Sequence, residues 1–279
     1  MKLKFTRRIA AITAAAATVA AAVLTGGGAT ALPSGNYVAF GDSFPANPGN
    51  SDPSEIGAGG CPQSVSNVSR KVAHKTGLLL HDYSCNGSVV YMPNDPIKML
   101  NSQVDRAIAN GHLNHETQMV TFFLGANDAM QAFWAPNQIQ DELFNRAMVD
   151  AINKVKHTNP TARIMLVGYP EITSRDNVHF ACPINAFGFA PQIPAAPVHT
   201  IEMTLQARQQ RAAAETGAGF INMKDISNIH VAMCGRDGER QVSAILDSDT
   251  SQYNMTNHLT FRGTDVFSDI IANVYRSTF

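Results

Sequence analysis

Four short motifs in this sequence contain residue types that suit nucleophilic attack on a carbonyl carbon. Ser43 directly follows an apolar run, and a serine hydroxyl becomes an effective nucleophile when a neighbouring base removes its proton. His258 is the candidate base. The N–H groups of Ser43 and Gly87 and the side-chain amide of Asn127 are candidate donors to the oxyanion that such an attack creates. Taken singly, these residues also fit helix caps and tight turns, so the case for catalysis depends on their meeting at one place.

These motifs follow runs of residues that predict buried strands. Five β-rich runs, several continuously apolar, fit parallel strands covered on both faces: Asn36–Phe40, Leu78–Tyr83, Gln118–Leu124, Arg163–Gly168 and Gly219–Met223. Helical patterns lie between them, one with apolar residues at Ile139, Leu143, Ala147, Ala151 and Val155. Another runs from Val266 to Tyr275 behind Thr264, the expected N-cap. Strands that alternate with helices predict a parallel sheet in a three-layer α/β/α sandwich, with ligands bound at the carboxyl ends of the strands.

Taken together and in this order, the motifs resemble the conserved blocks of the SGNH (GDSL) hydrolase family. The matching residues are Gly41-Asp42-Ser43, Gly87, Gly125-Ala126-Asn127-Asp128 and His258, and the resemblance covers the whole chain after residue 31. Cys85-Asn86-Gly87, Gly168-Tyr169-Pro170 and the paired cysteines are similar to the secreted actinobacterial branch of GDSL esterases and lipases. The resemblance implies a flavodoxin-like sandwich with a five-stranded parallel sheet. It also implies a serine esterase or lipase that hydrolyses carboxylic esters through an acyl-enzyme on Ser43.

In that family the histidine acts first as general base and then as general acid, and the resemblance gives these roles to His258. Members usually carry an aspartate three residues before this histidine, and here the position is Met255. A carboxylate there would fix the imidazole tautomer and stabilise the imidazolium. We expect the main-chain carbonyl of Met255 to take over that role. Asp247 and Asp249, the nearest upstream carboxylates, remain the alternatives.

Three other classes of protein fit the sequence less well than an esterase of this family. An α/β-hydrolase needs a GxSxG elbow, and Pro45 stands where the second glycine would be. A metal hydrolase would have to use His112, His115 and Glu116, which lie in a glycine-flanked loop with poor ligand geometry, so no metal or cofactor is expected. A secreted, non-catalytic binding or surface protein on the same fold is the alternative from a different class, and only Met255 supports it.

The N-terminus predicts an export signal. Residues 1–31 combine four basic residues, an alanine-rich apolar run and a small-x-small site at Ala29–Ala31, so we expect cleavage there and a single hydrolase domain over 32–279. Arg7-Arg8 leaves open whether the general secretory or the twin-arginine route is used. Removal leaves 17 basic and 22 acidic residues, a net charge of −5, which argues against a nucleic-acid partner. The expected product is a secreted or cell-wall-associated monomer with no membrane-spanning segment.

Four cysteines remain after signal removal: Cys61, Cys85, Cys182 and Cys234. An even number in an exported chain predicts two disulfides, and among the three possible pairings the sequential one closes the shortest loops. The long proline-rich stretch 176–199 follows the end of a predicted strand and is a candidate wall of the acyl pocket, although a packed surface loop fits equally well. The expected partner is an acyl ester, and the sequence leaves open whether it is a lipid or an acylated glycan.

Overall fold

A parallel five-stranded sheet forms the centre of the computed structural model, which describes residues 35–132, 134–225 and 228–277. The strands are β1 (Asn36–Gly41), β4 (Leu79–Asp82), β5 (Thr117–Phe123), β6 (Arg163–Val167) and β10 (Gly219–Ile221). Their order in the sheet is β10-β6-β5-β1-β4, and every neighbouring pair is parallel. This is the flavodoxin-like order. Successive strands are added to the sheet first on one side of β1 and then on the other, and the switch falls between β1 and β5. All five strands predicted from the sequence are confirmed, whereas the predicted signal at 1–31 lies outside the described residues.

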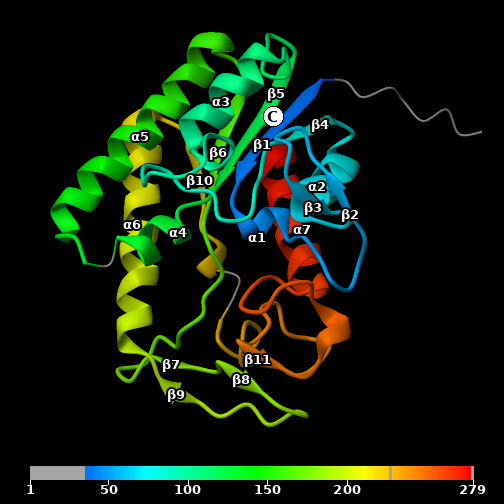
Figure 1. Cartoon of the computed structure of the whole chain (residues 1–279), viewed down its shortest axis with the longest axis vertical. Coiled ribbons are helices and arrows are strands. Elements are labelled where there is room, and N and C mark those ends of the chain that lie inside the picture. Colours follow the sequence, from blue (N-terminus) through cyan, green and yellow to red (C-terminus); the bar gives the residue numbers. More distant parts are fainter. Residues whose placement is uncertain (1–34, 133, 226–227, 278–279) are drawn as a thin grey trace, which may run out of the picture. The chain divides into compact units, whose positions relative to one another are not determined.

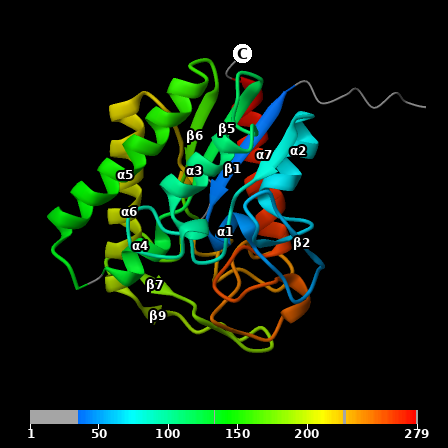
Figure 2. The same ribbon diagram turned by 45° about the horizontal axis from the view of Figure 1, so that its top comes forward.

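Helices cover both faces of the sheet and complete the predicted sandwich (Figures 1 and 2). On one face, α2 (Val68–Thr76) packs against α7 (Phe261–Ser277). On the other, α5 (Asn137–Thr158) lies between α3 (Leu100–Ala109) and α6 (Ala196–Thr216). No helix in the described ranges is both long and apolar enough to cross a membrane.

The sequence pattern located α5 correctly but assigned part of its buried face wrongly. Ile139 and Leu143 are 51% and 38% exposed, although both belong to the predicted apolar stripe. The apolar side chains that α5 buries are Phe144, Met148, Ala151, Ile152 and Val155. Their spacing follows the 3.6-residue helical period, whereas a strict repeat of four drifts around the helix and leaves the core.

Helix α7 also differs from prediction, because it begins three residues before Thr264. The hydroxyl of Thr260 accepts a hydrogen bond from the Gly263 N–H at 3.0 Å, which is the contact an N-cap residue makes. The Thr264 side chain instead bonds back to the Thr260 carbonyl inside the helix. The N-cap of the last helix therefore lies two residues after His258, and the helix itself begins at Phe261.

Short elements connect the sheet to the surface: α1 (Ser43–Ala46), β2 (Ser54–Ile56), β3 (Pro62–Ser64), η1 (Pro96–Lys98), α4 (Ala126–Gln131), β7 (Phe180–Ala181), β8 (Ile184–Asn185), β9 (Ile193–Pro194), η2 (Met223–Asp225), β11 (Leu246–Asp247) and η3 (Thr250–Gln252). Two of these strands, β7 and β9, pair within the proline-rich stretch, and β8 pairs with β11. The segment before His258 is therefore tied to the 176–199 stretch by backbone hydrogen bonds.

Two disulfides reinforce these loops. Cys61 pairs with Cys85, and Cys182 pairs with Cys234, with Cα atoms 5.3 Å and 5.1 Å apart. This is the sequential pairing. The second disulfide joins the 176–199 stretch to a segment 52 residues further along the chain, so the loops around the carboxyl ends of the strands are cross-linked covalently.

Candidate active site

Ser43 occupies the first position of α1, immediately beyond the carboxyl end of β1. The turn between them is tight, because a Cβ on Gly41 would lie 2.2 Å from the Pro45 ring, and only glycine avoids that clash. Asp42 caps α1 by accepting a hydrogen bond from the Phe44 N–H at 2.9 Å. The six buried residues of β1 hold this turn at the carboxyl edge of the sheet, where its strands end.

His258 meets Ser43 across 215 positions of sequence. Its Nε2 lies 2.7 Å from the Ser43 hydroxyl oxygen, and its ring packs on the Phe44 ring with centroids 4.7 Å apart. This distance is within the reach that a base needs to remove the hydroxyl proton. Burial lowers the pKa of His258 below its ordinary value of 6.5.

The carbonyl that orients His258 belongs to Thr256, so the prediction of Met255 is wrong by one residue. Nδ1 of His258 lies 2.8 Å from the Thr256 oxygen, a contact that raises the imidazole pKa and opposes the effect of burial. Asn257 between them adopts a left-handed backbone with φ of 60°, which brings the Thr256 carbonyl to the ring. The Met255 carbonyl instead accepts a hydrogen bond from the Ser243 hydroxyl at 2.8 Å.

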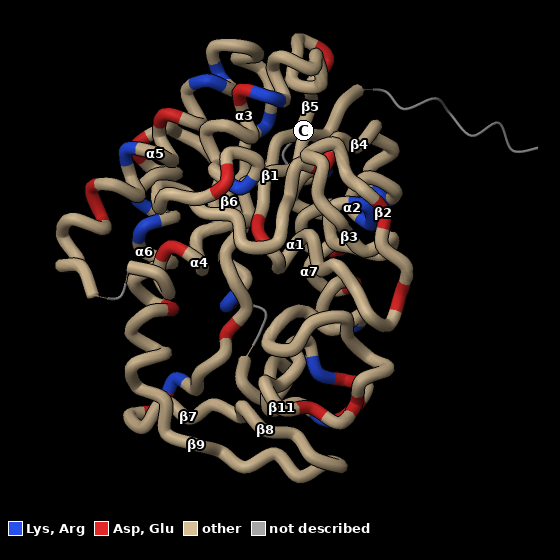
Figure 3. Tube along the Cα trace, viewed as in Figure 1, with Lys and Arg blue, Asp and Glu red and all other residues tan. Residues whose placement is uncertain are grey.

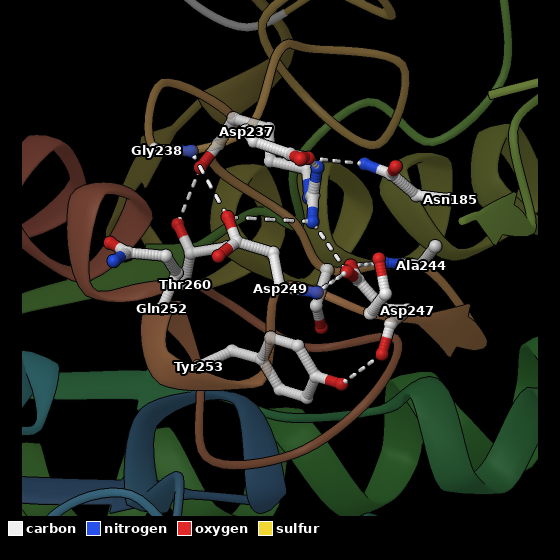
Figure 4. A network of polar contacts seen from close by, with 12 residues as sticks. Asn185, Asp237, Gly238, Ala244, Asp247, Asp249, Gln252, Tyr253 and Thr260 are labelled. Carbon is white, nitrogen blue, oxygen red and sulfur yellow. Dashed lines mark hydrogen bonds and ion pairs between the residues drawn. The ribbon is translucent and has the colours of Figure 1, made fainter. Parts of the chain in front are cut away.

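Neither upstream carboxylate bonds to the histidine. Asp247 and Asp249 both turn toward Arg240, and Figure 4 shows this cluster. Asp247 is buried and also accepts hydrogen bonds from the N–H groups of Ala244 and Asp249. Thr256 therefore supplies the contact to Nδ1 that a carboxylate makes in a full triad.

The other two predicted donors lie on segments that contact each other. The Asn127 side-chain amide donates to the carbonyl of Ser88, the residue after Gly87, at 2.9 Å. Gly87 has φ of 80°, a conformation that favours glycine. The amide of Asn127 carries two N–H donors, and the bond to Ser88 uses one of them. The convergence of the Ser43, Gly87 and Asn127 donors on one oxyanion stays a prediction.

Asp128 and Tyr169 are site residues whose contacts the sequence motifs did not reveal. The buried Asp128 carboxylate accepts three backbone N–H groups from residues 90–92, at 2.7, 2.9 and 3.1 Å, and so fixes the segment that follows Gly87. The Tyr169 hydroxyl donates to Asp42 and accepts from the Ala126 N–H. Burial raises the pKa of Asp42 to about 7, while the bond from Tyr169 acts in the opposite direction. A buried polar network therefore links the turn that carries Ser43 to the start of α4.

Ser43, Asn127 and His258 all line one cavity of about 590 Å³. Its wall is mostly apolar, and the 176–199 stretch contributes Ala181, Pro183, Ile193, Pro194, Ala195, Pro197 and Val198. No Lys, Arg, Asp or Glu occurs between residues 177 and 201, as the uncoloured β7–β9 region of Figure 3 shows. The volume is typical of a site for a small organic ligand. The sequence left two interpretations of this stretch open, and the structure supports the one in which it lines a pocket.

Two charged side chains also line the cavity and neutralise each other. The Lys224 ammonium lies 2.8 Å from the Glu202 carboxylate and 3.0 Å from the Pro170 carbonyl. Both side chains are at least nine-tenths buried. Within the described part of the chain, no group of three or more His, Cys, Asp or Glu residues is placed to hold a metal ion.

A serine–imidazole pair at the carboxyl edge of a flavodoxin-like sheet, open to an apolar cavity, defines this protein as an α/β/α hydrolase. The family follows from the sequence match. The chain belongs to the GDSL-like Lipase/Acylhydrolase family, whose model matches residues 39–265.

Individual relatives agree with that family. "Lipase 2" of Streptomyces coelicolor is 28% identical over 248 residues, which cover 78% of this chain and 79% of that protein. The crystal structure of phospholipase A1 from Streptomyces albidoflavus NA297 has a TM-score of 0.57 at 15% identity, covering 86% of this chain and 98% of that one. Est24, a carbohydrate acetylesterase from Sinorhizobium meliloti, has a TM-score of 0.54 at 14% identity, covering 88% of this chain and 99% of that one. The shared fold thus accommodates different substrates.

Proposed function

We propose that this chain is a secreted serine esterase that hydrolyses carboxylic esters with an apolar acyl group, without a metal or cofactor. One observation carries the proposal: the 2.7 Å contact between Ser43 Oγ and His258 Nε2 lies at the wall of a 590 Å³ apolar cavity. Export is supported by the signal pattern over 1–31 and by the two disulfides, which persist outside a reducing compartment.

In the proposed reaction, His258 takes the hydroxyl proton while Ser43 Oγ forms a bond to the ester carbonyl carbon. The carbonyl oxygen becomes an oxyanion, and the N–H groups of Ser43 and Gly87 and the amide of Asn127 donate to it. The carbon–oxygen bond to the alcohol then breaks, and His258 gives its proton to the leaving alkoxide. Water repeats the sequence on the acyl-enzyme, releases the acid and restores Ser43.

Thr256 has the task of keeping the imidazole in a usable tautomer. Its carbonyl accepts a hydrogen bond from Nδ1–H, so the proton stays on Nδ1, and Nε2 faces the serine without a hydrogen and can receive one. A carbonyl carries only a partial negative charge, so it stabilises the imidazolium less than an aspartate would. The proposed enzyme is therefore a Ser–His dyad supported by a main-chain acceptor.

The test is hydrolysis of p-nitrophenyl esters from acetate to palmitate by the wild type and by Ser43→Ala. We expect wild-type turnover, loss of at least about 10³-fold in Ser43→Ala, and unchanged rates with EDTA. Ser268→Ala is the matched control, because this buried serine of α7 bonds to Lys75 and Asp265 and does not line the cavity. Absence of wild-type turnover on every ester would favour a binding protein on the same fold.

A further inference from the structure

The loop that carries His258 is fastened to the rest of the fold by the backbone and side chain of Ser243. The Ser243 N–H donates to the His258 carbonyl at 2.9 Å. The Ser243 hydroxyl lies 2.8 Å from the Met255 carbonyl and 3.1 Å from the His258 carbonyl, and it accepts from the His258 N–H at 3.3 Å. Ser243 is fully buried, so water cannot replace these contacts.

We propose that Ser243 is a positioning residue for His258 and that its hydroxyl replaces the ordering effect of the missing triad carboxylate. The inference rests on the proposed function. A triad aspartate fixes the imidazole by bonding to it directly. In this chain the hydroxyl holds the backbone on both sides of Thr256–Asn257, the two residues that bring the Thr256 carbonyl to Nδ1. The tautomer is then controlled through the loop conformation.

Ser243 is itself held by a buried charge cluster. The Arg240 side chain is 1% exposed, and its guanidinium bonds to Asp237 and to the buried Asp247. Asp247 accepts from the N–H of Ala244, the residue after Ser243 (Figure 4). The Arg240 carbonyl accepts from the Thr260 hydroxyl, two residues after His258. The segment 240–244 is therefore fixed at both ends before it binds the histidine loop.

A second set of contacts connects this loop to the nucleophile helix. The Asn47 side chain donates to the Leu259 carbonyl at 3.2 Å, and the Asn254 side chain donates to the Asn47 carbonyl at 3.1 Å. Asn47 is the C-cap of α1, the helix that begins with Ser43. These bonds set the distance between the loop and α1. They do not touch residues 255–258, which are held by Ser243 and by a bond from the Asn257 N–H to the Ala244 carbonyl at 3.2 Å. Of these contacts, the Ser243 hydroxyl makes the ones that a single substitution removes.

The charged groups on the segments around the imidazole are already engaged. The titratable side chains are Asp42, Tyr169, Glu202, Lys224, Asp247 and Asp249. Asp42 bonds to Tyr169, and Glu202 bonds to Lys224. Asp247 pairs with Arg240, and Asp249 accepts a hydrogen bond from the Gly238 N–H. Removing the Ser243 hydroxyl takes away none of these partners, so a change in His258 titration would report the Thr256 contact.

The decisive variant is Ser243→Ala, measured with the p-nitrophenyl ester that the wild type hydrolyses fastest. Displacement of the imidazole by about 1 Å would lower kcat on the order of 10²-fold, and KM should stay within about twofold because the cavity wall is unchanged. The acid limb of the pH–rate profile should move to lower pH, because the Thr256 bond that raises the imidazole pKa is weakened. Ser243→Thr keeps the hydroxyl and should restore kcat to within about tenfold of the wild type.

Ser268→Ala again serves as the matched control, since it removes another buried, hydrogen-bonded serine hydroxyl. Equal loss of kcat in Ser243→Ala and Ser268→Ala would overturn the proposal and leave a general stability effect. An unchanged acid limb in Ser243→Ala would also overturn it.

Nitrogen-15 NMR of histidine-labelled protein separates this proposal from the proposed function, because it needs no turnover. The His258 resonance is assigned by its absence in His258→Gln. In the wild type we expect the Nδ1–H tautomer, and in Ser243→Ala we expect a mixture of tautomers. If the Nδ1–H tautomer persists unmixed in Ser243→Ala, Ser243 is no positioning residue, whether or not the protein hydrolyses esters.

Discussion

Replacing Asp42 with asparagine should make the protein more stable relative to wild type as the pH rises. Asp42 is completely buried beside Ser43, and burial raises its pKa from 3.8 to about 7. In the unfolded chain the same group ionises near pH 4. Between these two pH values, Asp42 is therefore largely protonated in the folded protein and largely ionised in the unfolded chain.

The sign of the effect follows from this difference. Stability contributed by Asp42 is fully present below about pH 4 and is lost as the pH rises toward 7. Each pKa unit corresponds to 1.36 kcal/mol, so the difference between the two pKa values of Asp42 amounts to about 4 kcal/mol of folding stability. Between pH 5 and pH 8 the change is about 2.5 kcal/mol. Asparagine resembles the protonated acid, stays neutral throughout this range and remains a good N-cap.

The assay is urea unfolding followed by far-ultraviolet circular dichroism at pH 5 and pH 8. The free energy of unfolding of Asp42→Asn minus that of the wild type should be more positive at pH 8 by about 2.5 kcal/mol. Effects of the substitution that do not depend on pH cancel in this comparison. Asp105→Asn is the control, because that carboxylate is 59% exposed and pairs with Lys154, so the change should stay below about 1 kcal/mol at either pH. An equal difference at both pH values for Asp42→Asn would refute the assignment of a raised pKa.

Three further results are expected. The acid limb of the kcat/KM profile should have its midpoint below pH 6.5, because burial lowers the pKa of His258 and only the neutral imidazole accepts the proton; a midpoint above that value would contradict the proposed base. Replacing both Cys182 and Cys234 with serine should lower the free energy of unfolding by about 4 kcal/mol in urea, since the bond closes a loop of 52 residues; a loss below about 1 kcal/mol would contradict this. Glu202→Gln leaves the buried Lys224 charge without its partner and should lower the free energy of unfolding by about 3–5 kcal/mol in the same assay. Combining Glu202→Gln with Lys224→Met should recover part of that loss. No recovery in the double variant would refute the charge argument.

The sheet was predictable from the sequence because burial on both faces leaves a local record. Each strand of a covered parallel sheet is a short apolar run, and β1 and β5 show this plainly. Ser43 and Asn127 could then be placed, since each follows one of these strands and the carboxyl ends of neighbouring strands share an edge. The buried face of α5 was predicted less well, because a repeat of four only approximates the helical period.

The acceptor for His258 could not be fixed from the sequence, because a carbonyl's direction depends on backbone dihedral angles. The left-handed conformation of Asn257 decides between Met255 and Thr256, and asparagine adopts that conformation only in some contexts. Likewise, nothing local indicated that Asp247 would pair with Arg240. The pairing is a tertiary contact between two groups in a segment without regular periodicity.

The absence of a triad carboxylate has a consequence for the whole cavity. With Thr256 as acceptor, no carboxylate among the described residues bonds to His258, and the pKa of about 7 keeps much of Asp42 protonated near neutral pH. The remaining charges, Lys224 and Glu202, cancel one another. An apolar acyl chain that enters this cavity therefore removes little water from charged groups. In the proposed mechanism the same arrangement stabilises the imidazolium weakly, so His258 stays neutral to lower pH. We therefore expect the low charge of the cavity to be accompanied by activity that extends into mildly acidic solution.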